Sequence, residues 1–400
     1  MTEPQNANIK FRLDLVYLLL YGTIACYYPF LALYFSSRNL SYTQIGIAFA
    51  INSLVGIIAQ PIWGYITDKY LNKKKTLLIA SMFCSVLIFN FVAAHNFFYI
   101  IAAIVLLLVF QSVTSPITDA YCYEIIEHTN SFNFGEVRLM GSVSFALVSL
   151  GLGKLIELKG IDSCFFVYSI LFLIYASLIS GFKFKGTGNI KRPSFKDVLD
   201  TVKQFEFMLF VFSVLIINIA LGANSSYIAM LVQKTGGSTA ILGFVWFVIA
   251  ISEIPAFFFG NHLSRRYGEL NIYLFAVALY SIRFFLCSFN QSYIGIIIIQ
   301  LMQSITFPVY LMGAMQYVNR IVPEQIKASG ITILSALGFG LGSFIGNLAG
   351  GILLENRDVF FLYRSLSVVC VISLLIGIFL KSKKSIEVKK AFTDEVHPKC

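Results

Sequence analysis

Residues 13–35 read LDLVYLLLYGTIACYYPFLALYF, and Asp14 is the only acidic or basic residue in this run. A helix needs roughly 20 apolar residues to cross the hydrocarbon core of a bilayer. The run is longer than the core of a secretory signal peptide, and it shows no small-residue cleavage pattern. It therefore predicts a membrane-spanning helix that stays in the protein.

Similar apolar runs continue to residue 380, and together they predict an all-α membrane protein with 12 transmembrane helices. Charged residues make up 12% of the chain, whereas soluble globular proteins carry about 25%. A mean hydropathy of +0.79 over this length cannot be hidden in one soluble core. The predicted helices span residues 13–36, 42–67, 76–94, 97–125, 136–157, 163–182, 205–232, 239–260, 271–288, 292–318, 328–354 and 359–380.

Lysine and arginine residues gather in alternate loops. If the N-terminus lies in the cytoplasm, the outer segments hold only Arg38, Lys159, Lys234 and Arg357. Because basic residues mark cytoplasmic loops, both termini are expected inside a plasma or bacterial inner membrane. The net charge of +10 is then explained by topology and anionic lipid headgroups. A nucleic-acid partner is not expected, because no basic helix lies outside the apolar runs.

The longest predicted loop, 183–204, separates six predicted helices from six others. Its glycines and Pro193 are typical of a linker. The predicted organisation is a six-helix bundle at 1–182, a cytoplasmic linker at 183–204, a second six-helix bundle at 205–380 and a cytoplasmic tail at 381–400. Two such bundles around a central cavity are the plan of a transporter that opens to alternate faces.

The two halves also repeat a loop pattern. Gly64 precedes Asp68 by four residues and Lys69 follows, while Gly260 precedes Ser264 by four residues and Arg265 follows. Gly64, Asp68 and Lys69 are interpreted as a conformational latch on the cytoplasmic side, in which Asp68 caps a helix or pairs with a base in one conformation only. The alternative is a simple turn with topology-setting lysines.

Four charges fall inside predicted helices, where an ionised side chain costs roughly 2.5–3.5 kcal/mol. Asp119 and Arg138 lie on adjacent helices of the first half, and Glu253 and Arg283 on adjacent helices of the second. This arrangement predicts two ion pairs that face a polar cavity, with structural pairing between helices as the alternative. A carboxylate there can take up a proton when its arginine moves away. We therefore predict proton coupling, through Asp119, Glu253 or both.

Neutral polar residues in the apolar runs add hydrogen-bonding capacity to the expected cavity: Asn52, Asn218, Asn224, Gln111, Gln300 and Gln303. Phe145, seven residues after Arg138, could stack on a flat solute. The seven cysteines show neither paired nor metal-like spacing. No nucleotide-binding loop or catalytic constellation is present, so the chain is not expected to be an enzyme or to need a metal or cofactor.

Several stretches in fixed order resemble the major facilitator superfamily, in its lactose-permease-like branch of oligosaccharide–proton symporters, nucleoside–proton symporters and 3-phenylpropionate permeases. They are residues 28–30 (YPF), 40–46 (LSYTQIG), 60–64 (QPIWG), 116–119 (PITD), 134–143 (FGEVRLMGSV) and 281–283 (SIR). The resemblance covers almost the whole chain and implies the major facilitator fold.

The resemblance also implies roles for single residues. Arg138 corresponds to an arginine that contacts sugar, Asp119 to its acidic partner, and Phe145 to a sugar-stacking tryptophan. Glu253 corresponds to a glutamate that binds substrate and couples transport. Arg283 corresponds to the arginine of the ninth helix.

The chain departs from the lactose permease in the tenth helix. Gln300, Gln303 and Thr306 stand where that permease has a lysine, a histidine and a glutamate. Coupling through an acid of this helix is thus excluded and a β-galactoside is disfavoured, whereas Gln300 and Thr306 look closer to the 3-phenylpropionate permeases. These three residues complete the predicted substrate-binding and proton-coupling set.

The leading interpretation is a monomeric secondary transporter that moves a small organic solute, such as a sugar, a nucleoside or an aromatic acid, by alternating access and proton symport. Its expected partners are this solute and the lipid bilayer. The first alternative is a drug or metabolite exporter of the same superfamily. The remote alternative is a membrane sensor that transports nothing.

Overall fold

The computed structural model describes residues 3–129, 133–182, 184 and 204–396, and every regular element in these ranges is helical. Twelve helical segments are long and apolar enough to cross a membrane. In the first half the helices are α1 (Glu3–Tyr27), η1 (Tyr28–Phe30), α2 (Leu31–Ser37), α3 (Tyr42–Lys69), α4 (Lys73–Leu87), α5 (Asn90–Ala93), α6 (Phe97–Thr129), α7 (Phe134–Lys159) and α8 (Ser163–Ser180). In the second half they are α10 (Phe205–Lys234), α11 (Thr239–Tyr267), α12 (Glu269–Phe289), α13 (Tyr293–Gln300), α14 (Gln303–Ile321), η2 (Glu324–Ile326), α15 (Lys327–Ile333), η3 (Leu334–Leu341), α16 (Gly342–Asn356) and α17 (Val359–Val396).

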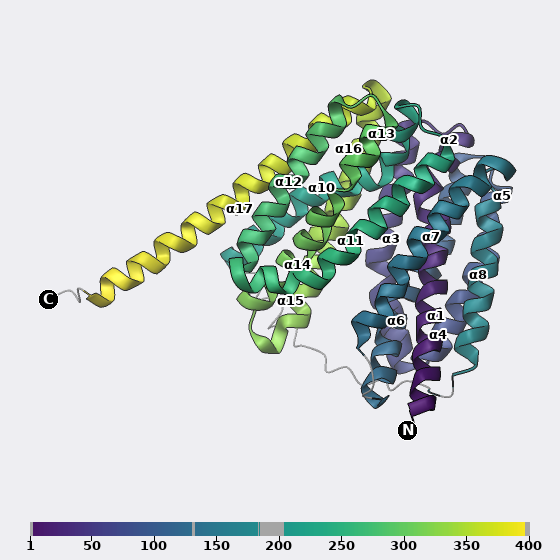
Figure 1. Ribbon diagram of the computed structural model, residues 1–400, viewed down its shortest axis with the longest axis horizontal. Coiled ribbons are helices and arrows are strands. Elements are labelled where there is room, and N and C mark those ends of the chain that lie inside the picture. The colour runs from purple at the N-terminus through teal and green to yellow at the C-terminus, as the bar shows by residue number, and fades with distance from the viewer. Residues whose placement is uncertain (1–2, 130–132, 183, 185–203, 397–400) are drawn as a thin grey trace.

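Each predicted span coincides with one of these segments, but four spans are interrupted. Pro29 lacks an N–H, and the first span tightens there into the 3₁₀ turn η1. The eleventh span contains the π-helical turn η3 between α15 and α16. The third and tenth spans also break, each into two helices. The predicted tail is mostly a continuation of α17, which leads away from the body of the molecule in Figure 1.

Helix packing joins the two halves mainly through two pairs of helices. Within the first half α1 packs on α7 and α8, and within the second α10 packs on α16 and α17. Between the halves α7 packs on α11 and α3 packs on α16. We call the side on which α1 begins the N-terminal face, at the lower edge of Figure 1, and the side on which α2 ends the opposite face. Almost all of the predicted linker, apart from Phe184 and Gln204, lies outside the described residues.

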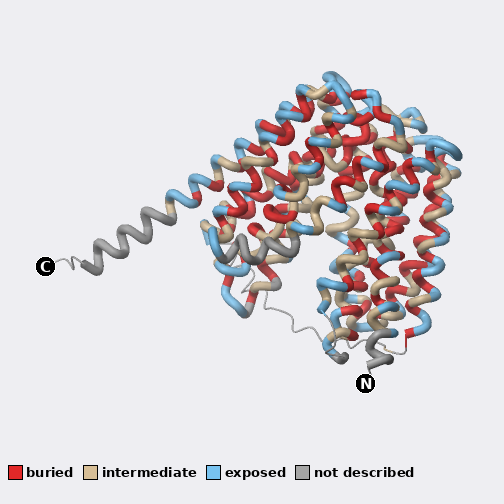
Figure 2. Tube along the Cα trace, viewed as in Figure 1, coloured by how far each residue is buried: buried red, intermediate tan, exposed pale blue. Residues whose placement is uncertain are grey.

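The outer sides of the helices expose large apolar side chains. On α8, Phe166, Ile170, Leu173 and Ile174 are exposed together at helical spacing. Figure 2 shows the same pattern, with buried segments where helices pack together and exposed segments along their outer sides. An apolar surface of this extent is stable only against lipid, so the chain is a multi-pass membrane protein.

The first bundle contains a largely buried ion pair at its N-terminal face. Lys73, at the start of α4, donates a hydrogen bond to Glu124 near the end of α6. The two side chains are only 8% and 20% exposed. The pair ties α4 to α6 where neither charge has free access to water.

Replacing Lys73 with Met is expected to destabilise the folded protein by about 3 kcal/mol, because the largely buried Glu124 carboxylate loses its ion pair with Lys73. Thermal unfolding in detergent measures the loss as a lower midpoint. The double variant Lys73→Met/Glu124→Leu should recover most of the midpoint, since it removes both charges. An unchanged midpoint in the single variant would contradict the prediction.

Candidate functional site

A cavity of about 980 Å³ lies between the two halves. The first half contributes side chains of α1, η1, α3 and α7, and the second half those of α10, α11, α12, α14, η3 and α16. Its wall includes Phe134 and Gly135, at the start of α7 on the N-terminal face. Toward the opposite face its wall includes Asn347, whose side-chain amide donates to the Phe49 carbonyl and accepts from the Ser226 hydroxyl. The cavity therefore extends toward the N-terminal face. On the side of the opposite face it is closed by contacts between the halves.

The acid–base pair of the first half lies beside this cavity. Arg138 Nε is 3.8 Å from Asp119 Oδ1, and the Tyr17 hydroxyl donates to the same oxygen at 2.6 Å. The guanidinium also lies over the Tyr21 ring, 4.2 Å from its centroid. Arg138 and Tyr21 line the cavity wall, whereas Asp119 does not. The structure thus brings Asp119 and Arg138 together as predicted, and of the two Arg138 lines the cavity.

The second half differs from the prediction. No direct ion pair joins Glu253 to Arg283, although the side chains of both residues are described. Instead the Gln303 side chain lies between them, because its carbonyl accepts from Arg283 and its amide donates to Glu253 Oε1 at 2.7 Å. Glu253 and Gln303 line the cavity. The carboxylate is therefore held by a neutral amide and faces the void.

Arg283 is only 1% exposed and does not line the cavity. Its guanidinium donates to Gln300, to Gln303 and, at 3.3 Å, to the Thr306 hydroxyl. A guanidinium has five N–H donors. Neutral acceptors on the tenth span accept hydrogen bonds from several of them, without the Glu253 carboxylate. Gln300 and Thr306 are fully buried with the guanidinium that they bind. Of the predicted residues on this side, Glu253 and Gln303 line the cavity, whereas Arg283, Gln300 and Thr306 do not.

Aromatic side chains from both halves meet at one part of the cavity wall. Phe145 of α7 lies 5.8 Å from Trp246 of α11, and Tyr28 of η1 lies 6.1 Å from it, as measured between ring centroids. Phe145 was predicted from the sequence, whereas Trp246 was not. One signal could have found it: Trp246 precedes Glu253 by seven residues and so lies on the same face of one helix. Of the expected polar residues, Asn52, Asn218 and Asn224 also line the cavity, whereas Gln111 does not.

The residues of the proposed latch lie at the end of α3 on the N-terminal face, away from the cavity wall. Lys69 Nζ donates to the Tyr65 hydroxyl at 2.7 Å and lies over the Tyr70 ring. Asp68 forms no hydrogen bond or ion pair with any side chain that the structure describes. The matching residues Gly260, Ser264 and Arg265 lie within the last turns of α11, and their side chains fall outside that description. A latch formed by Gly64, Asp68 and Lys69 stays a prediction.

Comparison with known proteins agrees with this architecture. The sequence profile described as "MFS_1 like family" matches residues 10–365. The uncharacterized transporter YwbF of Bacillus subtilis (strain 168) is 25% identical, over 89% of this chain and 90% of the relative. The maltose permease of Geobacillus stearothermophilus is also 25% identical, over 92% of this chain and 94% of the relative.

Among solved structures, a mutant of the nucleoside transporter NupG superposes with a TM-score of 0.86 at 14% identity, over 93% of this chain and 99% of that one. Identity this low shows a shared fold alone. The profile, however, covers the greater part of the sequence, and its relatives are transporters rather than enzymes. The chain belongs to the MFS_1-like family and is a multi-pass transporter of the major facilitator superfamily.

Proposed function

We propose that this transporter carries a sugar or a nucleoside, by alternating access and in symport with protons. The cavity between the halves carries the proposal: Glu253 faces it with its charge unpaired, close to the aromatic cluster of Tyr28, Phe145 and Trp246. Carboxylate and amide groups can bind hydroxyls, and aromatic faces can stack on a sugar ring or a base.

The charges of the cavity favour a neutral solute over an aromatic acid. The Arg138 guanidinium already contacts Asp119, so its charge is partly compensated. The Glu253 carboxylate repels an anionic solute. The names of the relatives agree with this choice, since they include a maltose permease and a putative nucleoside transporter of Escherichia coli.

Proton coupling is assigned to Glu253. Among the side chains that the structure describes, the Gln303 amide is the one hydrogen-bonded to this carboxylate and none forms an ion pair with it. Protonation therefore removes a charge that the cavity must otherwise hydrate and costs no described ion pair. Solute binding and protonation of Glu253 then support each other. The basic loops support an orientation in which the N-terminal face lies in the cytoplasm, with the protein in the plasma or inner membrane. This conformation is accordingly inward-facing, and one chain supplies the whole cavity, so a monomer suffices.

Uptake into proteoliposomes with an alkaline interior tests the proposal. Radiolabelled maltose, uridine and 3-phenylpropionate serve as probes, with an internal pH dye as the second readout. We expect maltose or uridine to accumulate with matching internal acidification, and a protonophore to abolish both. Accumulation of 3-phenylpropionate alone, flux that ignores the pH gradient, or export of unrelated cationic drugs would overturn the proposal.

A further inference from the structure

A second internal repeat lies at the opposite face. Residues 41–46 read SYTQIG and residues 238–243 read STAILG, so a serine precedes a glycine by five positions at the start of both α3 and α11. Residues 153–157 read GKLIE and residues 351–355 read GILLE, so a glycine precedes a glutamate by four positions at the end of both α7 and α16. These four segments belong to the two helix pairs that join the halves.

The glycines of the repeat mark where backbones of opposite halves touch. A Cβ atom added to Gly153 would lie 2.9 Å from Gly243 Cα, and one added to Gly351 would lie 2.8 Å from Gly46 Cα. Both distances are shorter than real Cβ contacts allow. Small residues permit such close approach of helices. The opposite face is therefore closed at two crossings related by the repeat.

One helical turn beyond each crossing, a glutamate caps a helix of the other half. Glu157 Oε2 accepts from the Ala240 N–H at 3.0 Å and from the Ser238 hydroxyl at 2.9 Å. Glu355 Oε2 accepts from the Thr43 N–H at 2.9 Å. Ala240 and Thr43 are both the second residue of their helices. First-turn N–H groups have no partner within their own helix, and the helix dipole favours an anion there.

We infer that Glu157 and Glu355 are gate residues, which cap α11 and α3 across the two halves and hold the opposite face closed. Each cap joins opposite halves, so both must break when that face opens. Opening of this face rests on the alternating access of the proposed function, but it requires neither a particular solute nor proton coupling.

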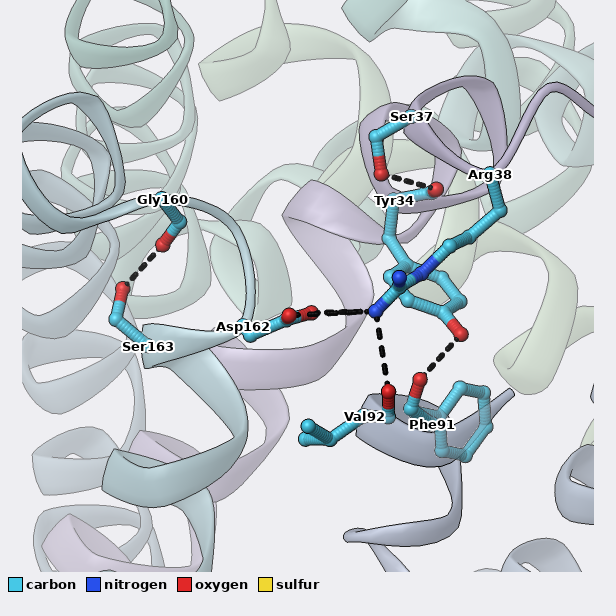
Figure 3. A network of polar contacts seen from close by, with 8 residues as sticks. All are labelled: Tyr34, Ser37, Arg38, Phe91, Val92, Gly160, Asp162 and Ser163. Carbon is cyan, nitrogen blue, oxygen red and sulfur yellow. Dashed lines mark hydrogen bonds and ion pairs between the residues drawn. The ribbon is translucent and has the colours of Figure 1, made fainter. Parts of the chain in front are cut away.

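A contact on the same face supplies the matched control. Arg38, after α2, donates to Asp162, before α8, at 3.0 Å, and its guanidinium also reaches the Val92 carbonyl (Figure 3). The Tyr34 hydroxyl donates to the Phe91 carbonyl in the same network. All of these residues belong to the first half. When the halves rock apart as rigid bodies, the Arg38–Asp162 pair stays intact.

The test measures the separation of the halves at the opposite face. Spin labels on Lys159→Cys and Lys234→Cys, at the exposed ends of α7 and α10, report distance distributions in a Cys400→Ser background. The remaining cysteines are buried and need no change. We expect Glu157→Ala and Glu355→Ala each to raise the open-to-closed ratio about five-fold, the effect of losing one helix cap, and together about 25-fold.

Two comparisons separate capping from a general loss of structure. Glu157→Gln keeps an acceptor oxygen and should shift the ratio less than Glu157→Ala. Asp162→Ala should leave the ratio unchanged, and all variants should unfold at nearly the same temperature because these side chains are exposed or half-buried. Unchanged distributions in the Glu157→Ala/Glu355→Ala double variant, or an equal shift in Asp162→Ala, would overturn the inference.

Discussion

Replacing Glu253 with Gln is expected to lower proton-driven accumulation of the solute roughly 100-fold, within the range for losing a positioned proton-transfer group. Gln has nearly the size and shape of Glu, and its carbonyl can still accept the hydrogen bond from Gln303. The cavity wall therefore keeps its geometry while position 253 loses the ability to carry a proton. Initial uptake rates and internal pH in proteoliposomes with an imposed gradient measure the effect.

Exchange of labelled for unlabelled solute supplies the control, because it needs no net proton movement. We expect Glu253→Gln to retain exchange, which would separate loss of coupling from loss of folding. Asp119→Asn should reduce accumulation less, since Asp119 does not line the cavity and already has Arg138 beside it. Accumulation at the native rate in Glu253→Gln would contradict the assignment of the coupling proton.

Replacing Gly243 with Val is expected to hold the opposite face open and to slow transport by about 100-fold. A Cβ at this position meets the Ser149 carbonyl oxygen and lies 2.9 Å from Gly153 Cα. Overpacking costs typically 1–3 kcal/mol, and a backbone contact leaves no flexible side chain to move aside. At the upper end of that range the equilibrium between open and closed states shifts by about 150-fold.

Gly151→Val is the matched control: Gly151 lies on α7, two residues before Gly153, and a Cβ there meets no atom within 4 Å. The labelled Lys159→Cys/Lys234→Cys pair should report an open face in Gly243→Val and a closed one in Gly151→Val. Equal uptake by the two valine variants would show that the α7–α11 crossing does not gate transport.

The number and position of the spans could be predicted from the sequence because lipid imposes a local rule. Every backbone polar group must bond within its own helix, and every helix must be apolar over the same thickness. The predicted span 42–67 thus became α3, Tyr42–Lys69, without any knowledge of its neighbours. The interruptions inside spans were missed, since the π-helical turn η3 lies among glycines and apolar residues that also suit a regular helix.

The candidate site could be predicted only in part. Asp119 and Arg138 were paired correctly because few ionised groups occur in the first bundle and each needs a partner. In the second bundle the sequence offered Arg283 both a carboxylate and three neutral acceptors. Which of them a buried guanidinium contacts depends on the distances between three packed helices, which local sequence does not encode.

The sequence by itself determined that lipid surrounds the protein and where each of the twelve spans lies along the chain. It also determined which polar residue types are available to line an interior cavity. Tertiary structure alone decided that Gln303 separates Glu253 from Arg283, that Trp246 joins the cavity wall, and that Glu157 caps α11. The physical reason is the distance along the chain over which each effect acts. Hydropathy acts on each helix separately, whereas these contacts join helices of different sequence position, and those across the halves exist in only one arrangement of the two bundles.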